Sequence, residues 1–161
     1  MKKFLVIAMT ASIMCLGAAA TEFKTFENKI FSIGYPADWE ETYTSDESLN
    51  VASPDDEVRF SITYNEQGPM KNQLKEAVDN WVYMRESHGH KVDQKLVRED
   101  YALVRTILTD EDDGTKSVEV WYVMISHEPQ GFSGTINCPL SRANEATDTL
   151  VEMLATLAPK Q

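Results

Sequence analysis

Hydrophobic residues follow two different spacings along this chain, and the spacing separates strands from helices. One-by-one alternation of apolar and polar residues is typical of a strand with one buried face, and recurrence every three or four residues is typical of an amphipathic helix. Alternation dominates the first half and is clearest at 58–64, where Val58, Phe60 and Ile62 share one face. The same pattern predicts further strands at 24–27, 31–35, 39–44 and 49–53.

A helical period replaces the alternation after residue 68. Its apolar residues fall on one face: Met70, Leu74, Ala77, Val78, Trp81 and Met84. Pro69 suits the first turn of a helix, because the N–H that proline lacks would be unpaired there. Gly89 suits the left-handed residue that often ends a helix, so we expect the helix to stop between residues 87 and 89.

Strands return between this helix and a second one near the C-terminus. Alternation predicts strands at 92–97, 102–108, 118–125 and 132–138, with a hairpin turn at Asp113-Gly114. The 118–125 segment is apolar on both faces, which is typical of a central strand covered on both sides. Ser141 or Asn144 can cap the second helix. The apolar stripe of that helix is Ala146, Leu150, Met153, Leu154 and Leu157.

The order of these elements predicts an α+β fold. Strands joined by turns form an antiparallel sheet, here of about six to seven strands, and two amphipathic helices can cover both of its faces or share one. We therefore expect a single domain over residues 21–161, an α/β/α sandwich with two main helices. No internal repeat or linker divides this part of the sequence.

The first 20 residues have the pattern of a signal peptide. Lys2 and Lys3 form a positive start, no charge interrupts the apolar stretch 4–17, and three alanines occupy 18–20. The apolar stretch is shorter than the roughly 20 residues with which a helix spans a bilayer. We expect cleavage near Ala20, which leaves a periplasmic or secreted protein without a membrane span; a retained N-terminal anchor is the alternative.

Only one of the two cysteines is expected to remain in the mature protein. Cys15 lies within the expected signal peptide, and Ser12 and Met14 depart from the aliphatic and small residues that precede a lipidated cysteine. After cleavage Cys138 is alone, so no intramolecular disulfide can form. Because Cys138 alternates with apolar Ile136, we expect it to be buried.

The chain is acidic, with 15 basic and 26 acidic residues and a formal net charge of −11. Loss of Lys2 and Lys3 with the signal peptide takes the charge from −11 to −13. A surface of this charge repels nucleic acids and anionic membranes, so neither is expected as a partner. It suits solubility, and also partners or ions of positive charge.

One motif resembles a known family. Residues 31–39 read FSIGYPADW, which is similar to the F-S-I-x-Y-P-x-x-W opening of PsbP-like and DcrB-like proteins, a superfamily that includes a Ran-binding nuclear import factor. The order of elements after the motif is similar too. The resemblance implies an antiparallel sheet sandwiched between helices and a non-enzymatic role as an assembly factor, extrinsic subunit or binding protein. It brings no catalytic residues, and it implies structural roles for Tyr35, Pro36 and Trp39.

Two clusters contain side chains that can bind metal ions. His88 and His90 are separated by one glycine, a spacing at which two imidazoles can hold a metal, but no third ligand is evident. Asp110, Asp112 and Asp113 offer carboxylates of the kind that Ca²⁺ prefers, without the later acidic residue that closes a calcium loop. A polar helix end and a solvated hairpin tip are the favoured interpretations, so no metal or other cofactor is expected.

No catalytic constellation is evident. A nucleophilic Ser or Cys needs a positioned His and an acid, and the sequence has three His and no Gly-x-Ser-x-Gly motif. Its seven glycines form no phosphate-binding loop. Trp81 and Met84 could line a ligand pocket under the first helix, but such a stripe usually belongs to the core. We expect the protein not to be an enzyme.

These observations favour two functional hypotheses. The first is an exported, non-enzymatic accessory or interaction protein of the bacterial cell envelope, with an envelope protein as its partner. The second is a periplasmic protein that binds a small ligand or a divalent cation. The sequence identifies neither the partner nor the oligomeric state.

Overall fold

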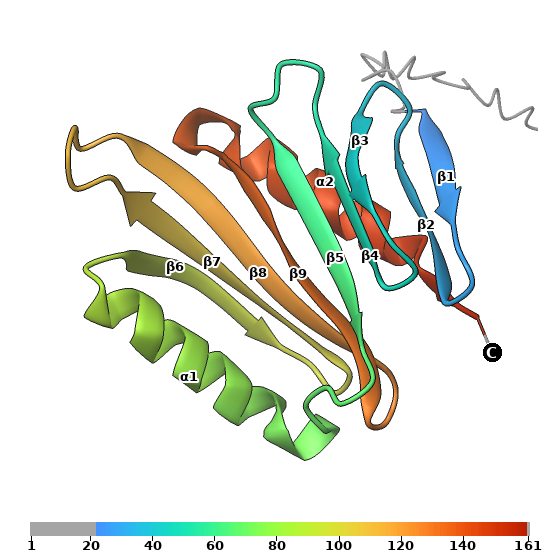
Figure 1. Cartoon of the computed structure of the whole chain (residues 1–161). Coiled ribbons are helices and arrows are strands. Elements are labelled where there is room, and N and C mark those ends of the chain that lie inside the picture. The colour runs from blue at the N-terminus through green and yellow to red at the C-terminus, as the bar shows by residue number, and fades with distance from the viewer. Residues whose placement is uncertain (1–21, 161) are drawn as a thin grey trace, which may run out of the picture.

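A seven-stranded antiparallel sheet forms the centre of the computed structural model, which describes residues 22–160 (Figure 1). The expected signal peptide and Cys15 lie outside the described residues. The strand order is β3-β4-β5-β9-β8-β7-β6. The strands are β3 (Glu40–Thr44), β4 (Ser48–Ala52), β5 (Arg59–Asn65), β6 (Lys91–Val97), β7 (Tyr101–Thr109), β8 (Lys116–His127) and β9 (Gln130–Pro139).

A second, smaller antiparallel sheet has the order β1-β2-β10. It consists of β1 (Phe23–Glu27), β2 (Phe31–Pro36) and β10 (Ala158–Pro159). The sequence pattern predicts β1 and β2 but not β10, because a two-residue strand has no period to detect. β10 returns the C-terminal end of the chain to β2, where Ala158 pairs with Ser32.

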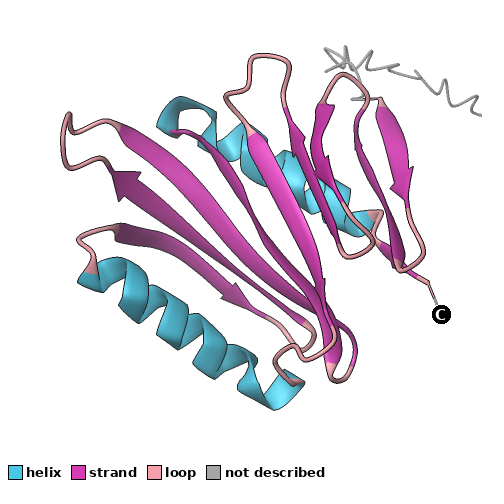
Figure 2. Cartoon of the chain, viewed as in Figure 1, coloured by secondary structure: helices cyan, strands magenta, loops and turns pink. Residues whose placement is uncertain are grey.

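Two helices pack on opposite faces of the large sheet (Figure 2). The first, α1 (Leu74–Ser87), contacts β6 and β7, and the second, α2 (Ala143–Ala155), contacts β9 and β2. The expected α+β sandwich, an antiparallel sheet of about six to seven strands with two main helices, is confirmed, and the helices cover both faces rather than sharing one. Among the described residues, no helix is long and apolar enough to cross a membrane.

The helix starts differ from those that the sequence predicts. α1 begins at Leu74 rather than beside Pro69, because the 71–73 segment first makes a short 3-10 turn. α2 is preceded by a similar turn and uses neither Ser141 nor Asn144 as its cap. The end of α1 agrees with the prediction, since Gly89 has a φ of 78°.

Most of the core lies between α2 and the large sheet. Its largest fully buried side chains are Tyr122, Phe31, Phe60 and Phe132. A smaller core lies under α1 and contains Leu74, Val78, Ala102, Val104 and Val123.

The burial of five residues agrees only in part with the sequence pattern. Tyr35, Trp39 and Cys138 are buried as expected. The predicted burial of Met70 and Met84 is wrong, because they are 44% and 37% exposed. Met70 precedes α1 and Met84 lies near its C-terminal end, so neither belongs to the buried cluster under the helix.

A single glycine near the middle of the sheet makes room for a buried tyrosine. Tyr122 of β8 stacks on Phe60 of β5 with ring centroids 6.0 Å apart, and β9 with Gly134 runs between these two strands. The Tyr122 hydroxyl donates a hydrogen bond to the Ser61 carbonyl at 2.8 Å. A Cβ on Gly134 would lie 1.9 Å from that carbonyl oxygen and 2.7 Å from the Tyr122 hydroxyl, so only glycine fits here.

Candidate binding face

On the α1 side, the helix covers only one half of the large sheet. α1 packs on β6 and β7 at one edge, and no described helix packs on the same side of β4, β5 and β9. In Figure 1, α1 runs along one edge of the sheet and leaves the broad surface of β5 open. The uncovered half is therefore a candidate surface for binding.

Eight hydroxyl and amide side chains line this uncovered half, and we call them the polar platform. They are Ser48, Asn50, Ser61, Thr63, Asn65, Ser133, Thr135 and Asn137, and all are half-buried. Alternate residues of a strand share a face, so their apolar neighbours, such as Leu49 and Ile62, point into the α2 core. The alternation that identifies the strands thus also places these polar side chains on one surface.

The strand register arranges the platform in rows. One row runs across five strands: Asn50, Ser61, Thr135, Trp121 and Val104. A neighbouring row runs in the same direction: Ser48, Thr63, Ser133, Val123 and Ala102. In both rows the residues are polar on β4, β5 and β9 and become apolar on β8 and β7, where α1 covers the sheet.

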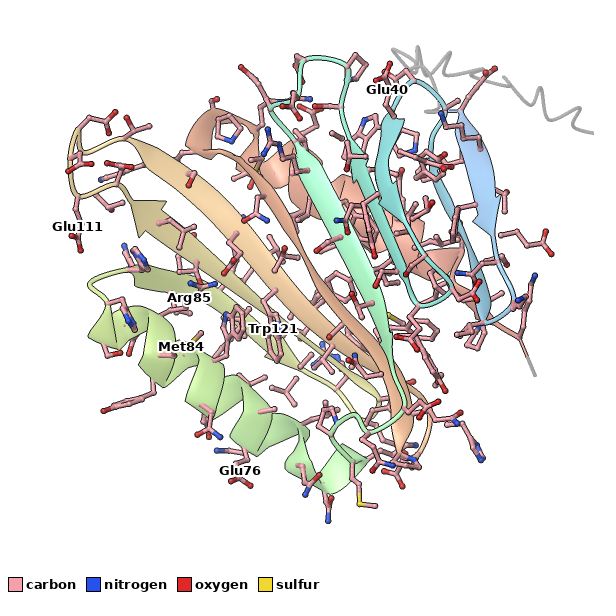
Figure 3. The ribbon with its side chains drawn as sticks, viewed as in Figure 1. Glu40, Glu76, Met84, Arg85, Glu111 and Trp121 are labelled. Atoms are coloured by element: carbon pink, nitrogen blue, oxygen red, sulfur yellow. The ribbon has the colours of Figure 1, made fainter. Side chains whose placement is uncertain are left out.

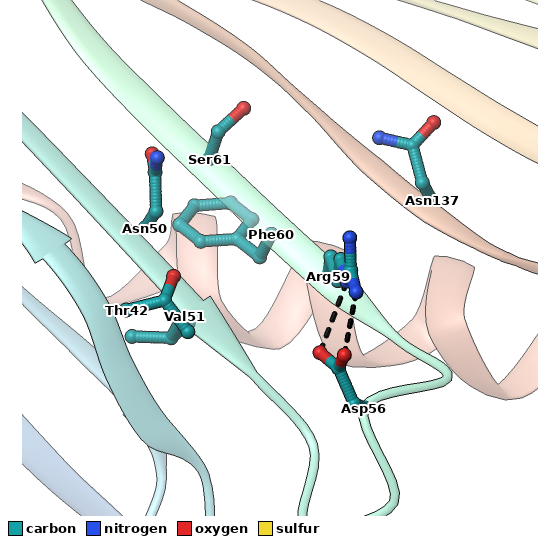
Figure 4. Close-up of a pocket in the computed structure, with 8 residues that line it drawn as sticks. All are labelled: Thr42, Asn50, Val51, Asp56, Arg59, Phe60, Ser61 and Asn137. Atoms are coloured by element: carbon teal, nitrogen blue, oxygen red, sulfur yellow. Dashed lines mark hydrogen bonds and ion pairs between the residues drawn. The ribbon is translucent and has the colours of Figure 1, made fainter.

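A groove of about 430 Å³ lies on this face (Figure 4). Its polar lining residues are Thr42, Asn50, Asp56, Arg59, Ser61 and Asn137. The Arg59 guanidinium makes two hydrogen bonds to the Asp56 carboxylate, at 3.0 and 2.5 Å, and these bonds lower the pKa of Asp56. Because the two charges offset each other, the groove carries no net charge.

The platform side chains bond mainly to one another. The hydroxyls of Ser48 and Thr63 lie 3.1 Å apart, and those of Ser61 and Thr135 lie 3.3 Å apart. The Asn50 amide has no hydrogen-bond partner among residues 22–160. A hydroxyl can donate one hydrogen bond and accept two, and an amide side chain offers both donors and acceptors. The platform therefore keeps unused donors and acceptors that face solvent.

Two stacked tryptophans bound the platform on its α1 side. The rings of Trp121 on β8 and Trp81 on α1 are nearly parallel, with centroids 4.7 Å apart. The Arg85 guanidinium lies 4.6 Å from the centroid of the Trp81 ring. At these distances Arg85 and Trp121 must cover opposite faces of the Trp81 ring. Trp121 in turn uses only one of its two faces to stack on Trp81. Figure 3 shows Arg85 and Trp121 between α1 and the sheet.

A buried ion pair lies beside the tryptophans. Glu119 of β8 has a side chain only 10% exposed and lies 2.5 Å from the Arg85 guanidinium, whose side chain is 22% exposed. Burial raises the pKa of Glu119, and the charge of Arg85 opposes this effect. Glu119 pairs across the strands with Thr106, which is fully buried.

Unpaired polar atoms are concentrated around the tryptophans and the ion pair. Within the described part of the chain, four buried side-chain atoms lack a hydrogen-bond partner of good geometry, and all four lie there: Trp81 Nε1, Arg85 Nε, Thr106 Oγ1 and Glu119 Oε1. Unpaired buried polar atoms carry a desolvation cost. Unlike its first half, which is anchored by Leu74 and Val78, the second half of α1 is thus held by stacking and a charge pair.

The histidines predicted as candidate ligands lie at the end of α1. His88 Nδ1 is 2.7 Å from the Met84 carbonyl oxygen, within the helix end itself. His90 Nδ1 lies 3.5 Å from the Thr109 backbone nitrogen. The structure does not add a third ligand to this pair from the described residues.

The predicted acidic cluster lies in the β7–β8 hairpin and bonds to its own turn. Asp110 accepts hydrogen bonds from the backbone N–H groups of Asp112 at 2.8 Å and Asp113 at 3.3 Å. Asp113 accepts one from the Thr115 N–H at 2.7 Å, which lowers the pKa of Asp113. No group of three or more His, Cys, Asp or Glu in the range 22–160 is arranged to hold a metal ion.

An apolar groove of about 440 Å³ lies on the opposite face, beside α2. Its lining residues are Leu96, Tyr101, Leu103, Met124, Val151, Leu154 and Ala155. Trp81 and Met84 were candidates to line a pocket under α1, but Trp81 stacks on Trp121 and Met84 is exposed. The apolar groove therefore lies under the other helix.

Comparisons with known proteins find relatives by structure only. No family model matches the chain, and no curated protein does. The Ran-binding protein Mog1p of Saccharomyces cerevisiae superposes with a TM-score of 0.60 at 10% identity, over 86% of this chain and 96% of Mog1p. The PsbP protein CyanoP of Synechocystis sp. PCC 6803 gives 0.59 at 6% identity, over 91% and 97%.

A protein from Bacteroides thetaiotaomicron gives a TM-score of 0.50 at 18% identity. The match covers 81% of this chain and 45% of that protein. At such identities, likeness in structure is evidence of a common fold and leaves function to be argued from the site.

Proposed function

Because this chain has the PsbP-like fold shared by Mog1p and CyanoP, as its 31–39 motif predicts, we propose that it is an exported, non-enzymatic binding protein of the bacterial cell envelope. The polar platform is its binding face. The observation that carries the proposal is the uncovered half of the large sheet, whose alternate residues are hydroxyl or amide side chains on β4, β5 and β9.

Two further observations support the proposal. One structural relative is, by its name, a Ran-binding protein, so this fold can serve binding. The signal-peptide pattern of residues 1–20 supports export. The proposed location thus rests on the sequence, and the proposed binding face rests on the structure.

The physical chemistry of the platform also favours binding. The half-buried hydroxyls and amides bond to one another and are reached by water, so this face needs no covering helix to be stable. The strand register fixes the backbone positions from which the side chains of each row project, and a site on a rigid backbone loses less entropy when it binds a partner. Asn50 is an example, because its strand is paired on both sides.

The proposal is tested by binding of purified protein, residues 21–161, to envelope fractions of its own cells. We expect saturable binding that is lost when Asn50 and Asn137 are both changed to Ala. The matched control is Asn80→Ala, the same substitution at an exposed position of α1. Absence of binding, or equal binding by the platform variant and the control, would contradict the proposal.

Export is tested separately. We expect the native protein to be recovered from the periplasmic or secreted fraction with an N-terminus near residue 21. Recovery of the protein with its first 20 residues attached would contradict the proposed processing.

A second candidate function is favoured by the apolar groove beside α2. Its walls are almost entirely apolar, and sites for small apolar ligands have this character and a comparable size, roughly 300–1,000 Å³. We expect medium-length fatty acids to raise the melting temperature, and Leu103→Trp, which would fill the groove, to abolish the shift. A flat response across the series would exclude this function.

A further inference from the structure

We propose that the component bound on the polar platform is a neutral saccharide chain. The inference rests on the proposed function, in which the platform is the binding face. It names the chemistry of what binds there.

The hydrogen-bonding groups of the platform match those of a sugar. Every hydroxyl of a sugar ring both donates and accepts, and so do the Ser and Thr hydroxyls of the platform, while each Asn amide offers a donor beside an acceptor. Asn50, Ser61 and Asn137 line one groove, and Figure 4 shows their side chains on the same side of the sheet. A site built from such groups recognises hydroxyl-bearing ligands and rejects analogues without them.

The spacing of the platform residues across the strands also suits a sugar chain. Asn50, Ser61 and Thr135 stand on three adjacent strands in direct register. Neighbouring strands are about 4.8 Å apart, which is close to the length of one pyranose unit. A sugar chain that crosses these three strands thus meets a polar group at each residue, and the next side chain in the row is Trp121.

The charge of the platform favours a neutral ligand. The whole chain carries −11, yet the eight platform side chains are uncharged and the Arg59–Asp56 pair in the groove is neutral overall. A polyanion is repelled by the surrounding acidic surface, and a polycation finds no acidic group on the platform. A neutral ligand is neither repelled by the acidic surface nor in need of a counter-charge on the platform.

The centre of the platform is polar, and the aromatic residues in register with it, Tyr43 and Trp121, lie on either side of that centre. Protein–protein interfaces have the opposite arrangement, with apolar, aromatic-rich centres surrounded by polar rims. A protein partner would dehydrate these groups and gain little apolar contact in return. A sugar replaces the lost water bonds with hydroxyl bonds, which favours a saccharide over a protein.

Trp121 provides the aromatic surface that sugar rings prefer. Aromatic faces carry negative charge density, and the C–H groups of a pyranose face complement it. One face of Trp121 is held by the Trp81 ring, which is itself held by Arg85. The stack fixes the indole at the end of the platform row, beside Thr135.

The test uses neutral oligosaccharides of glucose, N-acetylglucosamine, mannose and galactose, titrated calorimetrically into the protein, residues 21–161. At least one series should bind, and changing both Asn50 and Asn137 to Ala should weaken its binding at least tenfold. Asn80→Ala should bind as the parent does, and raised salt should leave the affinity unchanged, since no charge is involved. Melting curves of each variant show that it is folded.

Two outcomes would overturn the saccharide proposal: no binding in all four series, or equal binding by the double variant. Envelope fractions separate this failure from failure of the proposed function. Binding that survives protease treatment of the envelope but is lost after glycosidase treatment supports the saccharide. Binding that requires the platform but is lost after protease treatment would support the platform as the binding face and contradict the saccharide proposal.

Discussion

Replacing Arg85 by methionine should leave Glu119 as a buried carboxylate without a counter-charge. The Glu119 side chain is 10% exposed and that of Arg85 is 22% exposed. Removal of one partner from a buried ion pair costs roughly 3–5 kcal/mol. Because Arg85 lies at the rim of the core, we expect the lower end, a loss of about 3 kcal/mol in the free energy of unfolding at neutral pH.

The loss should depend on pH in a defined direction. Burial raises the pKa of Glu119 above 4.5, and Arg85 counteracts this effect, so the pKa rises further in the variant. The folded state then binds the proton more tightly than the unfolded state does. Stability therefore falls as pH rises through the raised pKa, and it recovers as pH falls towards 4.5.

Urea unfolding followed by circular dichroism tests this, for the parent and the variant at neutral pH and at about pH 5. We expect the gap between Arg85→Met and the parent to shrink at the lower pH. Adding Glu119→Gln to Arg85→Met should recover part of the lost stability at neutral pH, because it removes the unpaired charge. An equal gap at both pH values, with no recovery in the double variant, would refute an electrostatic origin.

Two further predictions concern the sheet. Gly134→Ala should lower the free energy of unfolding by about 3 kcal/mol, because its Cβ would lie 1.9 Å from the Ser61 carbonyl oxygen. Gly89→Ala, in open space at a φ of 78°, should lower it by only about 1–2 kcal/mol. Equal losses of stability in urea unfolding would contradict the packing explanation. Burial raises the pKa of Cys138 to about 11, so a thiol reagent should label it only as fast as the protein opens, and immediate labelling of the native protein would show that the thiol is accessible.

The hydrophobic pattern was sufficient for most of the fold. β5 alternates because Phe60 and Ile62 face a core while Arg59, Ser61 and Thr63 do not, and the sequence displays this directly. The second sheet is beyond such reasoning, because β10 pairs through backbone groups of two residues. The exposed ends of the α1 stripe were missed for a related reason, since the width of the surface under a helix is a tertiary property.

The candidate site was only half visible in the sequence. Polar residues at alternate positions of 59–65 and 131–137 can be read from the chain, but the pairing of β5 with β9 joins segments far apart in sequence. The Arg85–Glu119 pair was missed because a charged residue on a helix suggests solvent, and a charge within a strand suggests its open face. Only the position of α1 beside β8 brings the two together.

The polar platform is tested most directly by nuclear magnetic resonance of the labelled protein, residues 21–161, titrated with soluble fragments of its own envelope. The side-chain amide signals of Asn50 and Asn137, with backbone signals of β4, β5 and β9, should shift together and saturate. Shifts confined to the opposite face, around Leu103 and Met124, or no shifts at all, would contradict the platform as the binding face.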